Sequence, residues 1–468
     1  SSEVAYNAER LEGRIFTDEI IPARRGNILT RDGEPLATSL FRYQVEMDYG
    51  SPGFDSLRTF REQSDSLAKL LALYFRDKSA AAYAQAMQRE HTRRYRVTYR
   101  KDTLVPRSEG GLARWWDRMR GEEFLTVKLY DTLRDHTPVA LFPREIDYTE
   151  WQTLRRYPIL NWNMGMTYRL RERDERVYPQ GELARRTIGQ VGDKGNYGVE
   201  YVLRDVLEGR DGKARRQRIA RGFYGRVVGG DNSEPEDGLD VVTTLDLEMQ
   251  DVADRALRRQ LEAQNALWGT ALVMEVATGD LLAMANLSRT KSGAYAEVKN
   301  HALSSRMEPG STFKLAALLA LVDDAGMSLD ETFDTGNGAR VKVGRTTVQD
   351  SHGLPPLNLK DAVAHSSNVF FARAVYETYK DDPERYVDYL RHLHLDRTVG
   401  LEEFGAVAPI FPAPGMKIWY PDVSIVNMGY GYAIELTPLH TLTLYNAVAN
   451  DGCMVAPRLV REIRRGGE

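Results

Sequence analysis

Hydrophobic residues recur at helical spacing in several parts of the chain. In residues 62–74 and 80–90, and again in residues 249–261 within a charged segment, apolar side chains repeat every three or four positions. This spacing places them on one face and predicts amphipathic helices. Residues 311–325 are apolar and rich in alanine, so we expect a largely buried helix that begins after Pro309-Gly310.

Short apolar runs predict strands in the second half of the chain. Residues 239–245 form one such run. Residues 271–276 and 281–285 form two more, and the turn formers Ala277-Thr278-Gly279-Asp280 separate them, which is typical of a hairpin. A helix followed by this hairpin indicates a mixed α/β layer with an antiparallel sheet.

The character of the sequence changes near Gly238. Before this point the chain is rich in arginine and aromatic residues, and residues 231–238 are polar and rich in turn formers. We therefore predict two domains, 1–236 and 237–468. Within the first, residues 93–100 alternate like a strand with a solvated, charged face, and Trp115-Trp116 are expected to pack in a core.

Composition and charge exclude several classes of protein. The 468 residues carry a formal net charge of -4, which argues against nucleic acid as a partner. The only cysteine is Cys453, so no disulfide framework exists, and no apolar run reaches the length of a membrane span. We expect no metal and no cofactor, because histidines such as those in Asp350-Ser351-His352 and His392-Leu393-His394 are more typical of hydrogen-bonded surface groups.

The strongest chemical signal is Ser311 with Lys314. A serine hydroxyl becomes a nucleophile only when a base takes its proton, and a neutral lysine can do so. Residues three apart lie on one face of a helix, so the amine can reach the hydroxyl. The apolar neighbours of Lys314 would desolvate it and lower its pKa.

Spacing alone does not select this pair, because Ser-x-x-Lys occurs three times in the chain. Ser66 and Lys69 lie in a charged helical pattern that is typical of a solvated face. Ser288 is expected in a polar loop after the second strand of the hairpin, with Lys291 beyond it. Only Ser311 has a helix start and an apolar helix body.

A second element, Ser366-Ser367-Asn368, supports the choice of Ser311. It stands at the start of another apolar run. A hydroxyl at Ser366 could relay the proton of the nucleophile to a leaving amine, and Asn368 could hold the lysine and donate to a substrate carbonyl. The alternative is that Ser366 only caps a helix, and the two roles can coexist.

Taken together, these motifs resemble the class B penicillin-binding proteins, the monofunctional transpeptidases. The resemblance covers most of the chain, least clearly in residues 45–180. It looks closest to the division-specific enzymes of Gram-negative bacteria, because of the Ser-Ser-Asn form and the opening motif. Besides the two catalytic motifs, the matching segments are Arg24-Arg25-Gly26-Asn27-Ile28, Asp32-Gly33, Leu36-Ala37, Gly198-Val199-Glu200, Gly238 to Asp246, Met274 to Gly279, Gly429-Tyr430-Gly431 and Thr437-Pro438.

The resemblance implies an α+β multidomain fold. An elongated, non-catalytic pedestal (dimerisation-like) domain would precede a transpeptidase domain of the serine β-lactamase kind, an α/β domain with an antiparallel sheet flanked by helices. The last motif of the family, Lys-Thr-Gly or Lys-Ser-Gly, does not follow Asn368, since Lys291-Ser292-Gly293 precedes Ser311. We therefore expect the transpeptidase domain to be incomplete at its C-terminus and this polypeptide to be severely impaired.

The resemblance also implies a function and a location. The parent protein would be anchored in the bacterial inner membrane with a periplasmic ectodomain, and would cross-link peptidoglycan stem peptides ending in D-Ala-D-Ala. Its partners would be a membrane glycosyltransferase and divisome proteins, and β-lactam antibiotics would inhibit it. Two alternatives stay open: a non-catalytic scaffold of a cell-wall synthesis complex, and a β-lactamase or β-lactam sensor.

Overall fold

Two compact units make up the structure. The computed structural model describes residues 16–51, 54, 57–107, 111–121, 124–161, 168–193, 195–220, 223–226 and 232–465. The first unit consists of Ser1–Pro22, Ser39–Arg176 and Asp211–Pro235. The second unit consists of Ala23–Thr38, Val177–Arg210 and Glu236–Glu468.

The chain passes from the first unit to the second for the last time between Pro235 and Glu236, within the loop where the sequence suggests a domain boundary. Two earlier segments, 23–38 and 177–210, pack in the second unit although the sequence-based division assigns them to the first domain. The division of roles between a pedestal and a transpeptidase domain stays a prediction.

The core of the first unit lies around two helices, α2 (Leu57–Phe75) and α3 (Ala80–Arg94), which confirm the amphipathic helices expected at 62–74 and 80–90. Ser79 caps α3, because its side chain accepts a hydrogen bond from the backbone N–H of Ala82. Buried aromatic and aliphatic residues join these helices to the neighbouring strands and to α5 (Tyr148–Leu154); they include Phe54, Phe60, Leu67, Leu71, Met87, Phe142 and Trp151.

Most strands of the first unit are antiparallel. The strands β1, β8 and β9 form a three-stranded sheet, and the long strand β3 pairs with β6 and β7. The bounds of these elements are β1 (Phe16–Ile21), β3 (Pro35–Met47), β6 (Val139–Ala140), α5 (Tyr148–Leu154), β7 (Tyr168–Val177), β8 (Gly212–Ala220) and β9 (Phe223–Arg226).

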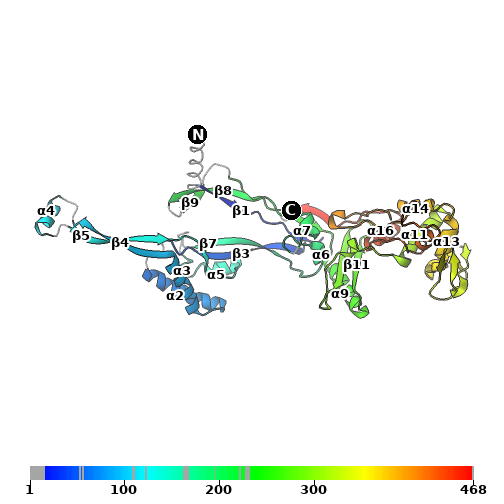
Figure 1. Ribbon diagram of the computed structural model, residues 1–468, viewed down its shortest axis with the longest axis horizontal. Helices are drawn as coiled ribbons and strands as arrows, with labels where there is room; N and C mark the ends of the chain where they lie inside the picture. The colour runs from blue at the N-terminus through cyan, green and yellow to red at the C-terminus, as the bar shows by residue number, and fades with distance from the viewer. Residues whose placement is uncertain are drawn as a thin grey trace, which may run out of the picture. The chain divides into compact units, whose positions relative to one another are not determined.

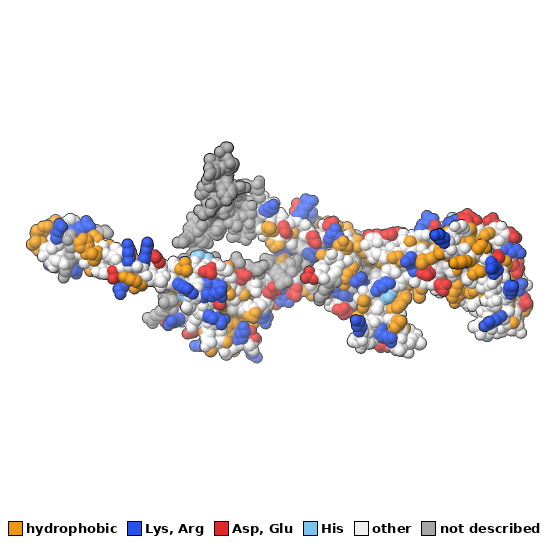
Figure 2. Space-filling model, viewed as in Figure 1, with side chains coloured by type: hydrophobic (Ala, Val, Ile, Leu, Met, Phe, Trp, Pro, Cys, Tyr) orange, Lys and Arg blue, Asp and Glu red, His pale blue; other side chains and the backbone are white. Residues whose placement is uncertain are grey.

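A long two-stranded ribbon extends within the first unit. It consists of β4 (Tyr95–Pro106) and β5 (Phe124–Arg134), with α4 (Gly111–Met119) at its end (Figure 1). Hydrophobic side chains gather over this end (Figure 2). Trp115 and Trp116 are 52% and 53% exposed, so the expectation that they pack in a core is wrong.

In the second unit, the predicted strand near 239–245 is β10 (Asp240–Thr243). It lies between β2 (Ile28–Leu29), with which it is parallel, and β18 (Val460–Arg464), with which it is antiparallel. The start of β3 pairs with β2 on the other side. Short helices pack against this sheet, namely α6 (Arg185–Ile188), α7 (Gly198–Val202) and α8 (Arg204–Leu207).

The predicted helix and hairpin that follow β10 are confirmed. Helix α9 (Leu247–Gln264) begins at Asp246, whose carboxylate accepts from the backbone N–H of Met249 at 2.9 Å. It packs on the antiparallel strands β11 (Trp268–Met274) and β12 (Leu281–Arg289), with β13 (Tyr295–Ala296) at the edge of the sheet.

The remainder of the second unit is mainly helical, and α11, α13 and α16 lie within it (Figure 1). Its core is rich in buried aromatic residues of α13 and α14, including Phe370, Phe371, Tyr379 and Tyr386. The helices are α10 (His301–Ser304), η2 (Gly310–Phe313), α11 (Lys314–Leu319), η3 (Ala320–Asp324), α12 (Leu359–Ala364), α13 (Asn368–Tyr379), α14 (Pro383–His392), η5 (Glu402–Phe404), α15 (Ser424–Met428) and α16 (Pro438–Ala449).

Small two-stranded pairs complete this part of the unit: β14 (Thr332–Phe333) with β17 (Leu357–Asn358), and β15 (Val341–Val343) with β16 (Thr346–Val348). Over the described residues, the structure contains no helix long and apolar enough to span a bilayer.

Candidate active site

Ser311 and Lys314 lie at the start of the helical run expected at 311–325. This run is continuous but has three parts, since the 3-10 turn η2 holds Ser311, α11 begins with Lys314, and η3 ends the run as a π-helix. Ser311 is exposed, whereas Lys314 is 5% exposed. The nucleophile candidate therefore faces solvent, and the base candidate beside it is buried.

A close backbone contact holds the turn in front of Ser311. The N–H of Gly310 donates to the carbonyl of Gly431 at 2.9 Å, and both glycines have positive φ angles, 56° and 90°. A Cβ atom on Gly431 would lie 1.9 Å from the carbonyl oxygen of Gly310. Only glycine fits such an approach in this backbone conformation.

The Lys314 ammonium is the centre of the polar cluster. Its Nζ donates to the carbonyl oxygen of Ser366 at 2.5 Å and to Oδ1 of Asn368 at 2.7 Å. The hydroxyls of Ser311 and Ser366 lie 3.2 and 3.1 Å from the same nitrogen. The structure thus brings together all four residues that the sequence suggests.

The number of protons on this nitrogen decides what it can do. The two short contacts go to oxygens that can only accept, so they use two N–H bonds. A neutral amine then has no N–H left, and its lone pair is free for the two hydroxyls. In this state Lys314 can accept the proton of Ser311.

Burial makes that neutral state accessible. Desolvation lowers the pKa of Lys314 to about 8, while the negative charge of Asp350 acts in the opposite direction. At pH 7 roughly one side chain in ten is neutral with a pKa of about 8, compared with roughly one in three thousand for an ordinary lysine.

The residues of the Ser-Ser-Asn triplet have separate structural roles. Ser367 is the helix cap, because its hydroxyl accepts from the backbone N–H of Phe370 at 3.0 Å. Ser366 precedes the cap in a left-handed conformation, with φ of 54°, which costs a non-glycine residue about 1–3 kcal/mol. Ser366 is therefore not the capping residue, and its carbonyl and hydroxyl both lie beside Lys314.

Asp350 supports this triplet, a role that the sequence does not reveal. Its carboxylate accepts from the hydroxyl of Ser367 at 2.7 Å and from the backbone N–H groups of Asn368 and Val369 at 2.5 and 3.1 Å. Asp350 is buried, and the bond from Ser367 is buried as well. Asp350 precedes Asn368 by 18 residues in the sequence, so no local pattern pointed to this contact.

The other Ser-x-x-Lys pairs have different environments. Ser66 is exposed and donates to the carbonyl of Glu62, which confirms a solvated helix face. Ser288 lies within β12 and not in a loop, so that expectation is wrong; its hydroxyl is 2.7 Å from Nε2 of His301. Lys291-Ser292-Gly293 forms an exposed turn between β12 and β13, as expected of a loop.

The histidines considered for metal binding make other contacts. Nδ1 of His352 lies 2.9 Å from the hydroxyl of Ser351, and His392 and His394 are exposed. Within the described ranges, no group of three or more histidine, cysteine, aspartate or glutamate side chains is arranged to hold a metal ion.

Comparison with known families agrees with this fold. Residues 20–243 match the penicillin-binding protein dimerisation domain, and residues 269–465 match the penicillin-binding protein transpeptidase domain. The chain therefore belongs to the penicillin-binding proteins, and the pairing of these two domains places it in class B.

Individual relatives match part of the chain. Penicillin-binding protein PbpB of Mycobacterium tuberculosis is 30% identical over 305 residues, which cover 62% of this chain and 43% of that protein. The probable peptidoglycan D,D-transpeptidase PenA of Neisseria meningitidis serogroup A is 27% identical over 292 residues, covering 60% of this chain and 48% of that protein. The chain thus spans about half the length of the curated relatives it matches.

The fold is shared with a solved structure of the family. Penicillin-binding protein 3 of Mycobacterium tuberculosis, in complex with aztreonam, aligns with a TM-score of 0.57 and 20% identity. The alignment covers 95% of this chain and 68% of that chain. The two-domain α+β fold expected from the sequence is confirmed.

Proposed function

We propose that this chain is the ectodomain of a peptidoglycan D,D-transpeptidase, with Ser311 as nucleophile and Lys314 as its base. The observation that carries the proposal is the position of the Lys314 Nζ atom, which lies within hydrogen-bond distance of the Ser311 hydroxyl and of both motif residues Ser366 and Asn368. A buried lysine with a lowered pKa beside an exposed serine is the arrangement that serine acyl transfer requires.

The first half-reaction transfers the stem peptide to the enzyme. Ser311 Oγ attacks the carbonyl carbon of the penultimate D-alanine while its proton moves to neutral Lys314. When the peptide C–N bond breaks, the proton reaches the leaving amine through the hydroxyl of Ser366, which lies 3.1 Å from the lysine nitrogen. Free D-alanine departs and an ester on Ser311 remains.

The second half-reaction forms the cross-link. The amine of a neighbouring strand attacks the ester and loses its proton to Lys314, and the Ser311 hydroxyl is restored. Asn368 orients both groups: its Oδ1 must face the lysine, because an amine with two N–H bonds committed to acceptors needs oxygen there. Its Nδ2 is then available to a substrate carbonyl.

A β-lactam would enter the same reaction as an acylating substrate. Its strained amide reacts with Ser311 to give an ester, and the leaving nitrogen stays tethered, so the acyl-enzyme persists. The complex of a structurally similar penicillin-binding protein with aztreonam supports this part of the proposal.

The setting of the reaction is part of the proposal. We place the protein on the periplasmic side of the bacterial inner membrane, in septal wall synthesis beside a membrane glycosyltransferase and divisome proteins. The opening motif around Arg24-Arg25-Gly26 and the Ser-Ser-Asn form of the second motif support this choice.

Mass spectrometry after prolonged incubation with benzylpenicillin tests the proposal. We expect one adduct on the peptide that contains Ser311, none in Ser311→Ala, and an unchanged adduct in Ser66→Ala, the matched control from the exposed Ser-x-x-Lys pair. Absence of any adduct on the wild-type protein overturns the proposal and favours a scaffold. Rapid turnover of the antibiotic without a stable adduct favours a β-lactamase.

A further inference from the structure

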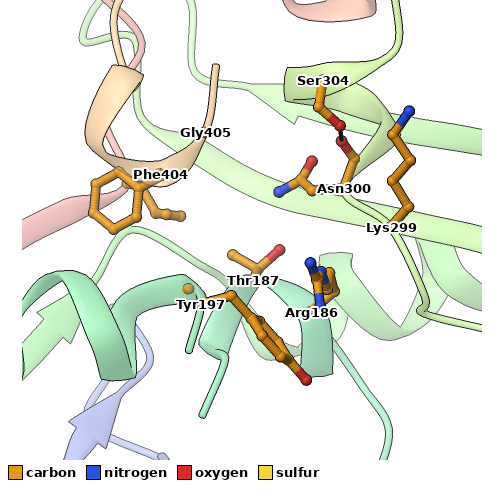
Figure 3. A pocket seen from close by; sticks show the side chains of 10 residues that line it. Arg186, Thr187, Tyr197, Lys299, Asn300, Ser304, Phe404 and Gly405 are labelled. Atoms are coloured by element: carbon orange, nitrogen blue, oxygen red, sulfur yellow. Dashed lines mark hydrogen bonds between the residues drawn. The ribbon is translucent and has the colours of Figure 1, made fainter. Parts of the chain in front are cut away.

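A small cavity lies in the second unit, away from the four residues of the candidate active site. Its volume is about 130 Å³, and its lining comes from α6, α7, η5 and the segment around α10. The residues that shape it are Arg186, Thr187, Tyr197, Asn300 and Phe404. Figure 3 shows Thr187 rising from α6 toward Asn300, with Phe404 across the cavity from Arg186.

Thr187 gives the cavity a buried hydrogen-bonding group without a partner. Its side chain is 2% exposed, and no described group lies within hydrogen-bond distance of its hydroxyl oxygen. An unsatisfied buried hydroxyl costs about 1–3 kcal/mol. Because the hydroxyl lines the cavity, a ligand with an oxygen acceptor would satisfy it.

Arg186 supplies a positive charge to the cavity. Its guanidinium stacks on the ring of Tyr197 at 3.7 Å from the centroid, and within the described part of the chain no acidic side chain forms an ion pair with it. This stacking holds the planar group in one orientation while leaving its N–H edge for a ligand. Lys299, which is exposed on the rim, adds a second positive charge.

The carboxyl group of Glu297, which lies close to the backbone of Arg186, does not cancel this charge. Glu297 accepts from the backbone N–H of Arg186 at 2.7 Å and from that of Asn286 at 3.1 Å. Desolvation raises its pKa to about 8, so it is mainly neutral at pH 7. Both oxygens of Glu297 accept from backbone N–H groups, and among the described residues this carboxyl group forms no ion pair with the Arg186 guanidinium.

We propose that this cavity binds the carboxylate of a small aliphatic acid or of a peptide C-terminus. A planar carboxylate matches the paired N–H groups of the Arg186 guanidinium, and one of its oxygens can accept from Thr187. The rings of Tyr197 and Phe404 offer an apolar wall to a methyl-sized group. Phosphate is a poorer match, because the enclosed part of the site presents one cation and one neutral donor for a dianion.

Direct binding measurements test this site independently of acyl transfer. The probe is N-acetyl-D-alanine, titrated into the wild-type protein by calorimetry and then soaked into crystals, and its matched control is N-acetyl-D-alaninamide, which lacks the carboxylate. We expect binding of the acid only, with density between Arg186 and Thr187. Acetate and N-acetyl-D-alanyl-D-alanine distinguish a small free acid from a peptide C-terminus. Acetate is small enough for the cavity to enclose it fully, whereas the peptide is not.

Three variants locate the binding. Arg186→Gln should weaken the affinity by about tenfold or more, the usual effect of losing a charge-assisted pair. Thr187→Val should weaken it less while leaving thermal stability equal or higher, because the unsatisfied hydroxyl is removed. Arg185→Gln is the matched control, since Arg185 stacks on Tyr178 and does not line the cavity.

The outcomes separate this site from the proposed enzyme function. Equal binding of the amide, tighter binding of phosphate than of the carboxylate, density for ordered water alone, or equal loss in Arg185→Gln and Arg186→Gln would each overturn the carboxylate site. None of these results bears on penicillin acylation of Ser311, which is measured separately by mass spectrometry.

Discussion

The lowered pKa of Lys314 predicts how the rate of acylation depends on pH. If the neutral amine is the base, the second-order rate of β-lactam acylation should rise about tenfold per pH unit below pH 7 and level off above an inflection near pH 8. The magnitude follows from the shift of the pKa from 10.5 to about 8, which multiplies the neutral fraction at pH 7 by roughly 300.

Two variants test the cause of this inflection. In Asp350→Asn the inflection should move to lower pH, because the negative charge that raises the pKa of Lys314 is removed. In Lys314→Arg the rate should fall to background at every pH, since a guanidinium stays protonated in proteins.

The assay is single-turnover acylation followed by mass spectrometry between pH 6 and 10, with the spontaneous hydrolysis of the antibiotic measured at each pH. The test depends only on how the acylation rate changes with pH, so a low absolute rate of acylation is sufficient. A profile that is flat from pH 6 to 9, or one that rises without a plateau to pH 10, would refute the role of a desolvated lysine base.

Predictions about stability and labelling follow from the packing of the second unit and from the exposed ribbon of the first. Asp350→Asn should also lower the free energy of unfolding by about 1.5–3 kcal/mol in urea titrations, because charge-assisted hydrogen bonds at the start of α13 are weakened; an unchanged midpoint contradicts this. Gly431→Ala should abolish labelling of Ser311, since the added Cβ atom would lie 1.9 Å from a backbone oxygen, and normal labelling would show that the turn can move. Trp115→Ser and Trp116→Ser should each change stability by less than about 0.5 kcal/mol, and a larger loss would mean that these side chains do pack.

Local patterns in the sequence predicted much of the fold. The amphipathic spacing in 249–261 and the paired apolar runs around Gly279 correspond to α9 and the β11–β12 hairpin, because each of these signals depends on nearby residues. The incorporation of residues 23–38 into the second unit depends on a pairing between Ile28 and Val241, about 210 residues apart, and no local pattern contains it.

The candidate site also contains residues that local sequence patterns indicate and one residue that they do not. Ser311 and Lys314 could be selected because a helix start and an apolar helix body distinguished them from the other two Ser-x-x-Lys pairs, and because the triplet at 366–368 stood at the start of another apolar run. Asp350 was not recognisable as their support, since the strand pair and loop that bring it to α13 leave no periodic signal. Trp115 was expected to be buried because tryptophan is a large apolar residue. It lies in α4 at the end of a two-stranded ribbon, and the ribbon has no second layer that could cover it.

The parallel pairing of β2 with β10 has a consequence for the order in which the chain can assemble. Ile28 leaves the ribosome well before Val241, and at about 5–20 residues per second the interval is on the order of 10–40 seconds. During this time β2 can pair with β3 on one side but lacks β10 on the other, while the remaining segments of the first unit are being synthesised. A chaperone or a rapidly closing first unit would therefore have its greatest effect on this early strand, and aggregation of the newly synthesised chain should depend more on residues 23–38 than on the helices of the candidate active site.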